Sequence, residues 1–444
     1  MNFNSFIYTI RNRINILDFL ILFGLIGYFL WLGQDFPIEW DDESHFAAVT
    51  DSILRGDFPR VSELGANEGI LWMPFGSNVL QAFLLKINGF SSVYDVWNIR
   101  SRISIPIILS IYIIFKNILV NLGVNFNLAR LVVLLFILSP TSSAALNTIR
   151  PEALCCLLLL TLINLVQSEN YFSSVLISFT LFFVHPLFGF ISFISILLFS
   201  TICFLFKLDE VRIDYAFIFW VKDKYKYFFL SLFAFIFIFH LHTLLSIDDG
   251  FNRLVHDLSF QASRKADRNL LKAFISNGLL ISFGSFSFLI GVLYGILKKN
   301  KISTAYYSNN LFSLILALPL LVFTKVIGQE MWYELYGLLS ILLLLSPYLN
   351  TNVNFLYDLV SKKNESLAYR SKLFSLFSII LFMPFIIQSG AFNTSFYGMN
   401  IGSIGADYNR ERSLLMTRIV QKINPDIIFN TDPYSLRQFN YFSK

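Results

Sequence analysis

The chain has 444 residues, of which 55% are hydrophobic and only 14% are charged, and its formal net charge is +5. Soluble proteins carry roughly 25% charged residues, so this composition excludes an ordinary soluble protein. We therefore expect an all-α polytopic membrane protein that lies among membrane lipids and does not bind nucleic acid.

Apolar runs long enough to cross the hydrocarbon layer recur along the whole chain. A helix needs roughly 20 such residues to cross about 30 Å, and we predict about eleven spanning helices, so the termini should face opposite sides. The expected spans are residues 15–33, 101–118, 131–148, 152–167, 171–185, 187–206, 227–246, 274–297, 308–324, 333–349 and 371–389.

The short basic loops predict how the chain is oriented. Lysine and arginine in such loops mark the cytoplasmic side. Arg11 and Arg13 precede the first span, and a lysine cluster at 298–301 lies between the eighth and ninth. We expect a cytoplasmic N-terminus and an outer C-terminus, in a bacterial inner (plasma) membrane. No small-residue cleavage site follows the first span, which favours a retained helix over a signal peptide.

Three polar regions are expected on the outer face. They are a first loop at 34–100, a second long loop at 247–273 and a C-terminal segment at 390–444, which is too small to form a core of its own. The remainder, within residues 1–389, would form one transmembrane domain.

The first loop contains two short amphipathic patterns, at 44–54 and 77–86. Apolar residues recur there at helical spacing, and neither segment is long enough to cross half a bilayer. We expect two interfacial helices whose apolar faces point toward the membrane. The apolar positions are Phe46, Val49, Ile53 and Leu54 in the first helix and Val79, Leu80, Phe83 and Leu84 in the second.

Three consecutive acids, Asp41, Asp42 and Glu43, open the first of these helices in the stretch WDDESHF. Acids in a first helical turn accept hydrogen bonds from free backbone N–H groups, which is worth about 1–2 kcal/mol, although one acid suffices. An Asp at the bilayer centre costs roughly 2.5–3.5 kcal/mol, so the cluster should lie at the interface. A spare carboxylate there is a candidate general base.

Several short motifs, taken in order, resemble the GT-C glycosyltransferases, a class that includes protein O-mannosyltransferases and lipid A aminoarabinose transferases. These motifs are Asp42-Glu43-x-His45-Phe46, Gly56-Asp57-Phe58-Pro59, Pro140, Arg150-Pro151-Glu152, His185-Pro186 and Trp332-Tyr333-Glu334-Leu335-Tyr336. The family often has an Arg where this chain has Gln329 or Glu330. The resemblance implies a GT-C-like helix bundle and a polyprenyl-phosphate-linked sugar donor.

The resemblance also implies roles for the acidic stretch. An outer-loop carboxylate takes the proton of the acceptor hydroxyl as the hydroxyl attacks the anomeric carbon with inversion. Asp42 is the first candidate for this base and Asp41 the second, whereas Glu43 is a candidate cap or acceptor contact. His45 would orient the base or contact a phosphate. The alternative is that the acids only cap the helix and hydrate the surface.

A lipid-phosphate leaving group needs positive charge at the outer interface. The candidate phosphate ligands are Arg150, Arg253, Arg264, Arg268 and Lys325, with His185 and His256 as further candidate contacts. Arg264, Arg268 and Lys272 recur every four residues and would share one helix face. For any single one of these residues, contact with anionic lipid headgroups is the alternative.

Metal and cofactor signals are weak. The acid triplet could hold Mg or Mn, since hard cations favour carboxylates, but a lipid-monophosphate donor does not require a metal. We expect no required cofactor. Cys155 and Cys156 lie inside a predicted span and support neither a disulfide nor a zinc site.

Three functional classes follow. The first is an inverting glycosyltransferase that passes a sugar from a polyprenyl phosphate to a glycan, lipid or protein acceptor. The second is a polysaccharide polymerase or ligase with a lipid-pyrophosphate donor. The third is a lipid or sugar transporter without chemistry, whose polar residues usually lie near the membrane midplane on broken helices.

Overall fold

The computed structural model describes most of the expected helical region and leaves part of the chain undescribed. The described residues are 15–35, 41–56, 75–91, 96–168, 170–205, 269–298, 304–328, 331–349 and 367–389, with four single residues between 252 and 263. Within these ranges the backbone is almost entirely helical and contains no β-strand, which confirms the predicted all-α class. The expected span at 227–246 and the C-terminal segment lie outside the described residues.

The helices follow the apolar runs of the sequence. They are α2 (Ile16–Asp35), α3 (Asp41–Leu54), α4 (Gly76–Ile87), α5 (Val96–Asn121), α6 (Phe126–Leu138), α7 (Pro140–Leu146), α8 (Glu152–Gln167), α9 (Tyr171–Val184), α10 (Pro186–Leu205), α13 (Leu270–Ser276), α14 (Gly278–Lys298), α15 (Thr304–Val322), α16 (Glu334–Leu349) and α18 (Leu367–Gln388). A π-helical turn, η3 (Phe323–Gly328), and a 3-10 turn, η4 (Met331–Tyr333), connect α15 to α16.

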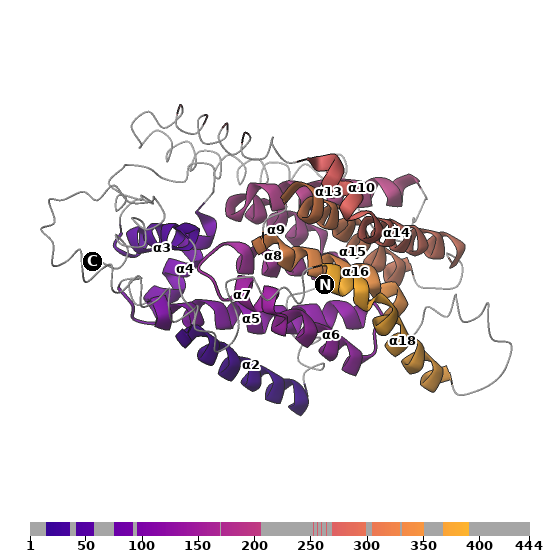
Figure 1. The fold of residues 1–444 in the computed structure, drawn as a ribbon, viewed down its shortest axis with the longest axis horizontal. Coiled ribbons are helices and arrows are strands. Elements are labelled where there is room, and N and C mark those ends of the chain that lie inside the picture. Colours follow the sequence, from indigo (N-terminus) through magenta and orange to yellow (C-terminus); the bar gives the residue numbers. More distant parts are fainter. Residues whose placement is uncertain are drawn as a thin grey trace, which may run out of the picture.

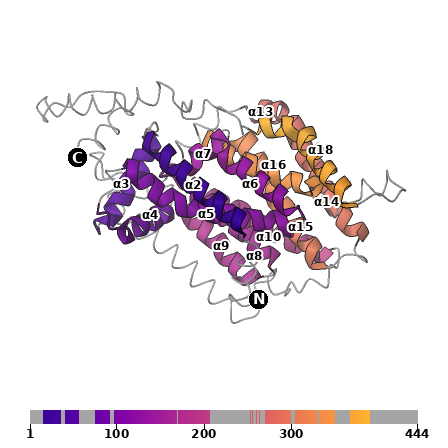
Figure 2. The same ribbon diagram turned by 90° about the horizontal axis from the view of Figure 1, so that it is seen from below.

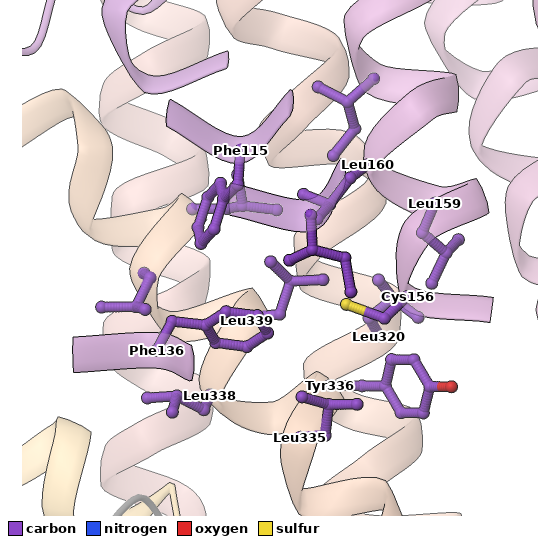
Figure 3. Close-up of a cluster of buried hydrophobic side chains, with 14 of the residues drawn as sticks. Phe115, Phe136, Cys156, Leu159, Leu160, Leu320, Leu335, Tyr336, Leu338 and Leu339 are labelled. Atoms are coloured by element: carbon purple, nitrogen blue, oxygen red, sulfur yellow. The ribbon is translucent and has the colours of Figure 1, made fainter. Parts of the chain in front are cut away.

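The long helices form one bundle with α3 and α4 at one end (Figures 1 and 2). Helix α8 packs against α5, α9 and α15, and α15 packs in turn against α10, α14 and α16. Figure 3 shows side chains from several of these helices meeting in the core, among them Phe115, Phe136, Leu160, Leu320 and Tyr336. All five side chains are buried, so close packing holds the centre of the bundle together.

Two of the expected spans, 131–148 and 274–297, each contain a break between two helices in the structure, which the sequence did not predict. Helices α6 and α7 meet at 69°, and α13 meets the first part of α14 at 71°. The first break falls at Ser139, whose backbone is extended at φ −60° and ψ 140° before Pro140 opens α7. A residue before proline disfavours the helical conformation, which explains this break.

Several helices are long and apolar enough to cross a membrane. Among the described residues, Arg102–Asn121 and Leu311–Gly328 meet this criterion alone, and the two bent pairs raise the number to as many as 4 if each pair is one span. Six further helices are apolar but shorter. Membrane-spanning character is therefore supported, while the number of about eleven spans stays a prediction.

The two short helices expected in the first loop are present as α3 and α4, and their interfacial location stays a prediction. The two helices bury different faces. In α3 the apolar residues Phe46 and Val49 are buried within the protein. In α4 the buried face contains Ser77, Asn78 and Gln81, whereas Phe83 is 59% exposed. The outward apolar face predicted for both helices is thus present in α4 alone.

A buried charged cluster joins α2 to α5 and α6. Asp18, in the first turn of α2, accepts hydrogen bonds from both Nε (3.0 Å) and Nη2 (2.9 Å) of Arg130. The Nζ of Lys116 lies 2.9 Å from the same carboxylate, and the hydroxyl of Tyr112 donates to it at 2.7 Å. We call these four residues the Asp18 cluster. It lies at the beginning of α2, away from the end that leads to α3.

Candidate functional site

Several of the motifs that carry the family resemblance meet at the end of the bundle where α3 and α4 lie. The guanidinium of Arg150 lies 4.3 Å from the ring centre of Trp332 and 5.5 Å from that of Phe46. These residues come from the turn before α8, from η4 and from α3. Sequence segments far apart in the chain therefore share one location, which we call the motif end.

Arg150 is held by Glu152 as well as by these rings. Its Nε donates to both carboxylate oxygens of Glu152 at 3.2 Å, and its Nη2 donates to Oε1 at 3.0 Å. The hydroxyl of Tyr336, on α16, donates to the backbone carbonyl of Glu152 at 2.9 Å. Both charged side chains are buried, so each needs the other. The phosphate-binding role expected for Arg150 stays a prediction, because its described contacts are structural.

His185 connects α9 and α10 to the same region. It ends α9 in an extended conformation because Pro186 follows it and begins the next helix. Its Nε2 lies 3.3 Å from the hydroxyl of Tyr333, and its ring packs 4.8 Å from the ring of Phe188, measured between centres. The side chain of His185 is buried at the motif end. The phosphate contact expected for His185 stays a prediction.

A neutral hydrogen-bond network fixes α3 on α4 and on the Arg150 turn. The hydroxyl of Thr50 donates to Oε1 of Gln81 at 2.8 Å, and Nδ2 of Asn78 donates to Thr50 Oγ1 at 2.9 Å. The Nε2 of Gln81 then donates to the carbonyl of Ile149 at 3.2 Å. All three polar side chains are buried, so the network sets how α3 lies beside Arg150.

The acidic triplet occupies the first turn of α3, as the sequence predicted. The side chains of Asp41, Asp42, Glu43 and His45 lie outside the described residues, so their roles stay predictions. Position 42 precedes Phe46 by four residues, and positions with this spacing share one face of a helix. Position 42 therefore lies on the face of α3 that contains the contact with Arg150.

Lys325 lies in the π-helical turn η3, a kind of irregularity that often marks functional positions. Its Nζ donates to the carbonyl of Ser389, at the end of α18, at 3.0 Å. Among the described residues no carboxylate lies within ion-pair distance of this ammonium. A methyl group at Gly337 would lie 3.2 Å from its Cε, so the glycine leaves room for the lysine. An ammonium has three donors, and a neutral carbonyl uses one.

Two polar side chains near Arg150 were not singled out from the sequence. Asn147 ends α7 and is 0% exposed, and neither atom of its amide finds a hydrogen-bond partner among the described residues. The buried hydroxyl of Ser142 likewise has no hydrogen-bond partner among the described residues. Leaving such a group unpaired costs about 1–3 kcal/mol, which marks the segment as a functional candidate. The polar run PTSSAALNT between two leucine-rich segments was the available signal.

The remaining predicted site residues are only partly described. Arg253, His256, Arg264 and Arg268 lie outside the described residues, whereas Lys272 is exposed on α13. In the described part of the chain, which leaves out the side chains of the acidic triplet, no three His, Cys, Asp or Glu side chains gather into a metal-binding group.

The fold and site together define a helical protein with membrane-spanning character and a polar, partly charged end. A comparison with known protein families finds no matching model, and neither the curated proteins nor the solved structures contain a match.

Proposed function

We propose that the protein is an inverting glycosyltransferase of GT-C type that transfers a sugar from a polyprenyl-phosphate carrier to an acceptor on the outer face of the membrane. One observation carries this proposal. The helix that begins with the acidic triplet, the Arg150 turn, His185 and the Trp332–Tyr333 turn contact one another at the motif end. Such an arrangement supports a shared site, because it brings together a buried arginine, a buried histidine and the helix that begins with the acids.

The chemistry divides between an acid and a cation. The acceptor hydroxyl attacks the anomeric carbon, the bond from that carbon to the phosphate oxygen breaks, and the lipid phosphate departs with the bonding electrons. Asp42 or Asp41 takes the hydroxyl proton. Lys325 stabilises the charge on the departing phosphate, since its ammonium is held by a neutral carbonyl and retains donors. The Arg150–Glu152 pair holds the turn that precedes α8.

Asn147 is a candidate for contact with the sugar. It lies three residues before Arg150, and its amide offers both donors and an acceptor. Sugar hydroxyls both donate and accept hydrogen bonds, so they match an amide better than a phosphate does. No metal enters this scheme, in keeping with the sequence-based expectation.

The test follows lipid-linked sugars by mass spectrometry in membranes that contain the protein. We expect one lipid-monophosphate sugar to be consumed and free lipid phosphate to appear. Replacing the triplet by Asn, Asn and Gln (D41N, D42N, E43Q) should abolish this turnover without loss of folded protein. Turnover that survives in the triple variant contradicts the assignment.

Asp51 supplies a matched control on the same helix. It lies outside the triplet and pairs with Arg55 at 3.1 Å, so Asp51→Asn should keep turnover per folded molecule. The lipid product also separates the polymerase or ligase class, because those enzymes release a lipid pyrophosphate.

A transporter is the alternative that one structural feature favours. Broken helices mark the binding sites of many transporters, usually in two related halves, and this chain has two bent pairs, α6–α7 and α13–α14. The short arms of the two pairs, α7 and α13, are unlike, however. Every residue of α7 after Pro140 is buried, while α13 contains no buried residue. Movement of intact sugar lipid across vesicles, without release of lipid phosphate, would favour this alternative.

A further inference from the structure

Helix α13 presents apolar side chains outward. Leu271 is 70% and Ile275 68% exposed, and Leu270 and Phe274 are exposed as well. Burying one such side chain away from water is worth about 1.5–3 kcal/mol. With four exposed apolar side chains on seven residues, exposure of α13 to water is energetically unfavourable.

The orientation of α13 is fixed by hydrogen bonds at both of its ends. At its start, Oδ1 of Asn269 accepts from the backbone N–H of Lys272 at 2.8 Å. At its end, Nδ2 of Asn277 donates to the carbonyl of Ala273 at 2.9 Å and to that of Lys325 at 3.3 Å. The helix is thus a defined element and not a frayed extension of α14, and it is attached to the π-helical turn.

The exposed apolar surface continues from α13 onto α14. Leu279, Phe286 and Leu289 are exposed along α14, which is apolar over most of its 21 residues. The two helices meet at 71°, and Figure 1 shows α13 turned away from the line of α14. If lipid surrounds α14, then α13 lies nearly flat at the end of that helix, where hydrocarbon meets headgroups.

We propose that α13 is an interfacial membrane-binding helix whose partner is the phospholipid bilayer itself. Leu271 and Ile275 enter the acyl chains, and the exposed Lys272 extends toward the phosphate layer. Because Asn277 hydrogen-bonds to the backbone of Lys325, the helix also sets the depth of the π-helical turn. It thereby holds the Lys325 ammonium near the level of lipid phosphates.

Depth measurements with single spin labels test this orientation without reference to sugar transfer. Cys155, Cys156 and Cys203 are replaced by Ala, and Leu271→Cys and Ile275→Cys are labelled one at a time in phosphatidylcholine–phosphatidylglycerol vesicles. Collision rates with oxygen and with a water-soluble nickel chelate give the depth of each label. Leu279→Cys and Phe286→Cys form the matched pair on α14, and the buried Phe283→Cys is the control for an inaccessible position.

The geometry fixes the expected differences. Seven residues along α14 separate positions 279 and 286 by about 10 Å at 1.5 Å per residue, and most of this distance should appear as depth. Positions 271 and 275 are about 6 Å apart along α13, but the 71° bend leaves about 2 Å of depth difference. The labels at positions 271 and 275 should both collide more often with oxygen than with the nickel chelate.

Three results would overturn the proposal. Dominant collision with the nickel chelate at 271 and 275 would place α13 in water. Low collision rates with both reagents, as at position 283, would mean that protein covers it. A depth difference of about 6 Å would mean that α13 continues across the bilayer. None of these results depends on whether the protein transfers a sugar.

Discussion

The two ends of the bundle each bury an arginine paired with an acid, but they differ in what remains unpaired. In the Asp18 cluster one carboxylate is bound by Arg130, Lys116 and Tyr112. Arg130 also donates to Asn127 at 2.7 Å and to Asn15 at 2.6 Å, so its hydrogen bonds are used within the protein. The Asp18 cluster therefore has the features of a stabilising contact between helices.

The motif end contains a similar buried ion pair and, in addition, polar groups that lack hydrogen-bond partners among the described residues. The Arg150–Glu152 pair is as buried as the Asp18 cluster. The turn η3, whose Phe323 packs against Tyr333, also contains Lys325, which is held by a neutral carbonyl. The amide of Asn147 has no partner among the described residues. Polar groups left in this state are costly unless something binds them. The comparison therefore supports a stabilising role for the Asp18 cluster and is consistent with the ligand binding proposed for the motif end.

The largest expected effect is at the Asp18 cluster. Asp18→Asn keeps the side-chain shape but leaves Lys116 and Arg130 buried without an acid, which should cost about 3–5 kcal/mol of stability. Thermal unfolding in detergent measures this loss. A triple replacement of Asp18, Lys116 and Arg130 by Leu, Met and Met should recover most of the stability, because apolar residues of similar volume often replace buried ion networks without cost. An Asp18→Asn protein as stable as its parent would break the comparison.

Lys325 should behave in the opposite way. Lys325→Met removes a charge whose described acidic neighbour, Glu334, is only partly buried and is not within ion-pair distance, so the thermal stability should change little. Turnover of the lipid-linked sugar should fall by about 10²–10³, the usual effect of removing one group that stabilises developing charge. Lys325→Arg, which keeps the charge, should retain part of the activity. If Lys325→Met lowers the thermal stability as much as Asp18→Asn does, then the two ends of the bundle do not differ in role as proposed.

The sequence predicted much of this fold because apolar runs determine where membrane-type helices form. The helix expected at 152–167 is α8, with the same bounds, and 333–349 differs from α16 by one residue. The breaks at Ser139 and Asn277 were missed although polar residues interrupt both apolar runs there, and Pro140 was a further local signal at the first break. The face that α3 buries was also missed, since an amphipathic pattern alone does not say whether the apolar side meets lipid or the protein.

The candidate site was predictable in outline and not in detail. Order and sidedness brought Arg150, His185 and Trp332 into one region on sequence grounds, and the structure places these three together. The pairing of Arg150 with Glu152 depends on the turn that separates them, which no periodicity encodes. The Asp18 cluster could not be predicted from the sequence for a related reason. Asp18, Lys116 and Arg130 each look like an isolated charge near the end of a span.

The smallest expected effect concerns the neutral network under α3. Thr50→Val removes the hydroxyl that donates to Gln81 and accepts from Asn78, at a cost of about 1 kcal/mol. Because the loss is local, backbone amides of residues 46–56 should exchange hydrogen faster, while those of α8 should not change. Thr50→Ser keeps the hydroxyl and is the matched control. Equal exchange in both variants would mean that α3 is held by other contacts, whereas faster exchange in α8 as well would make this network part of the global structure, like the Asp18 cluster.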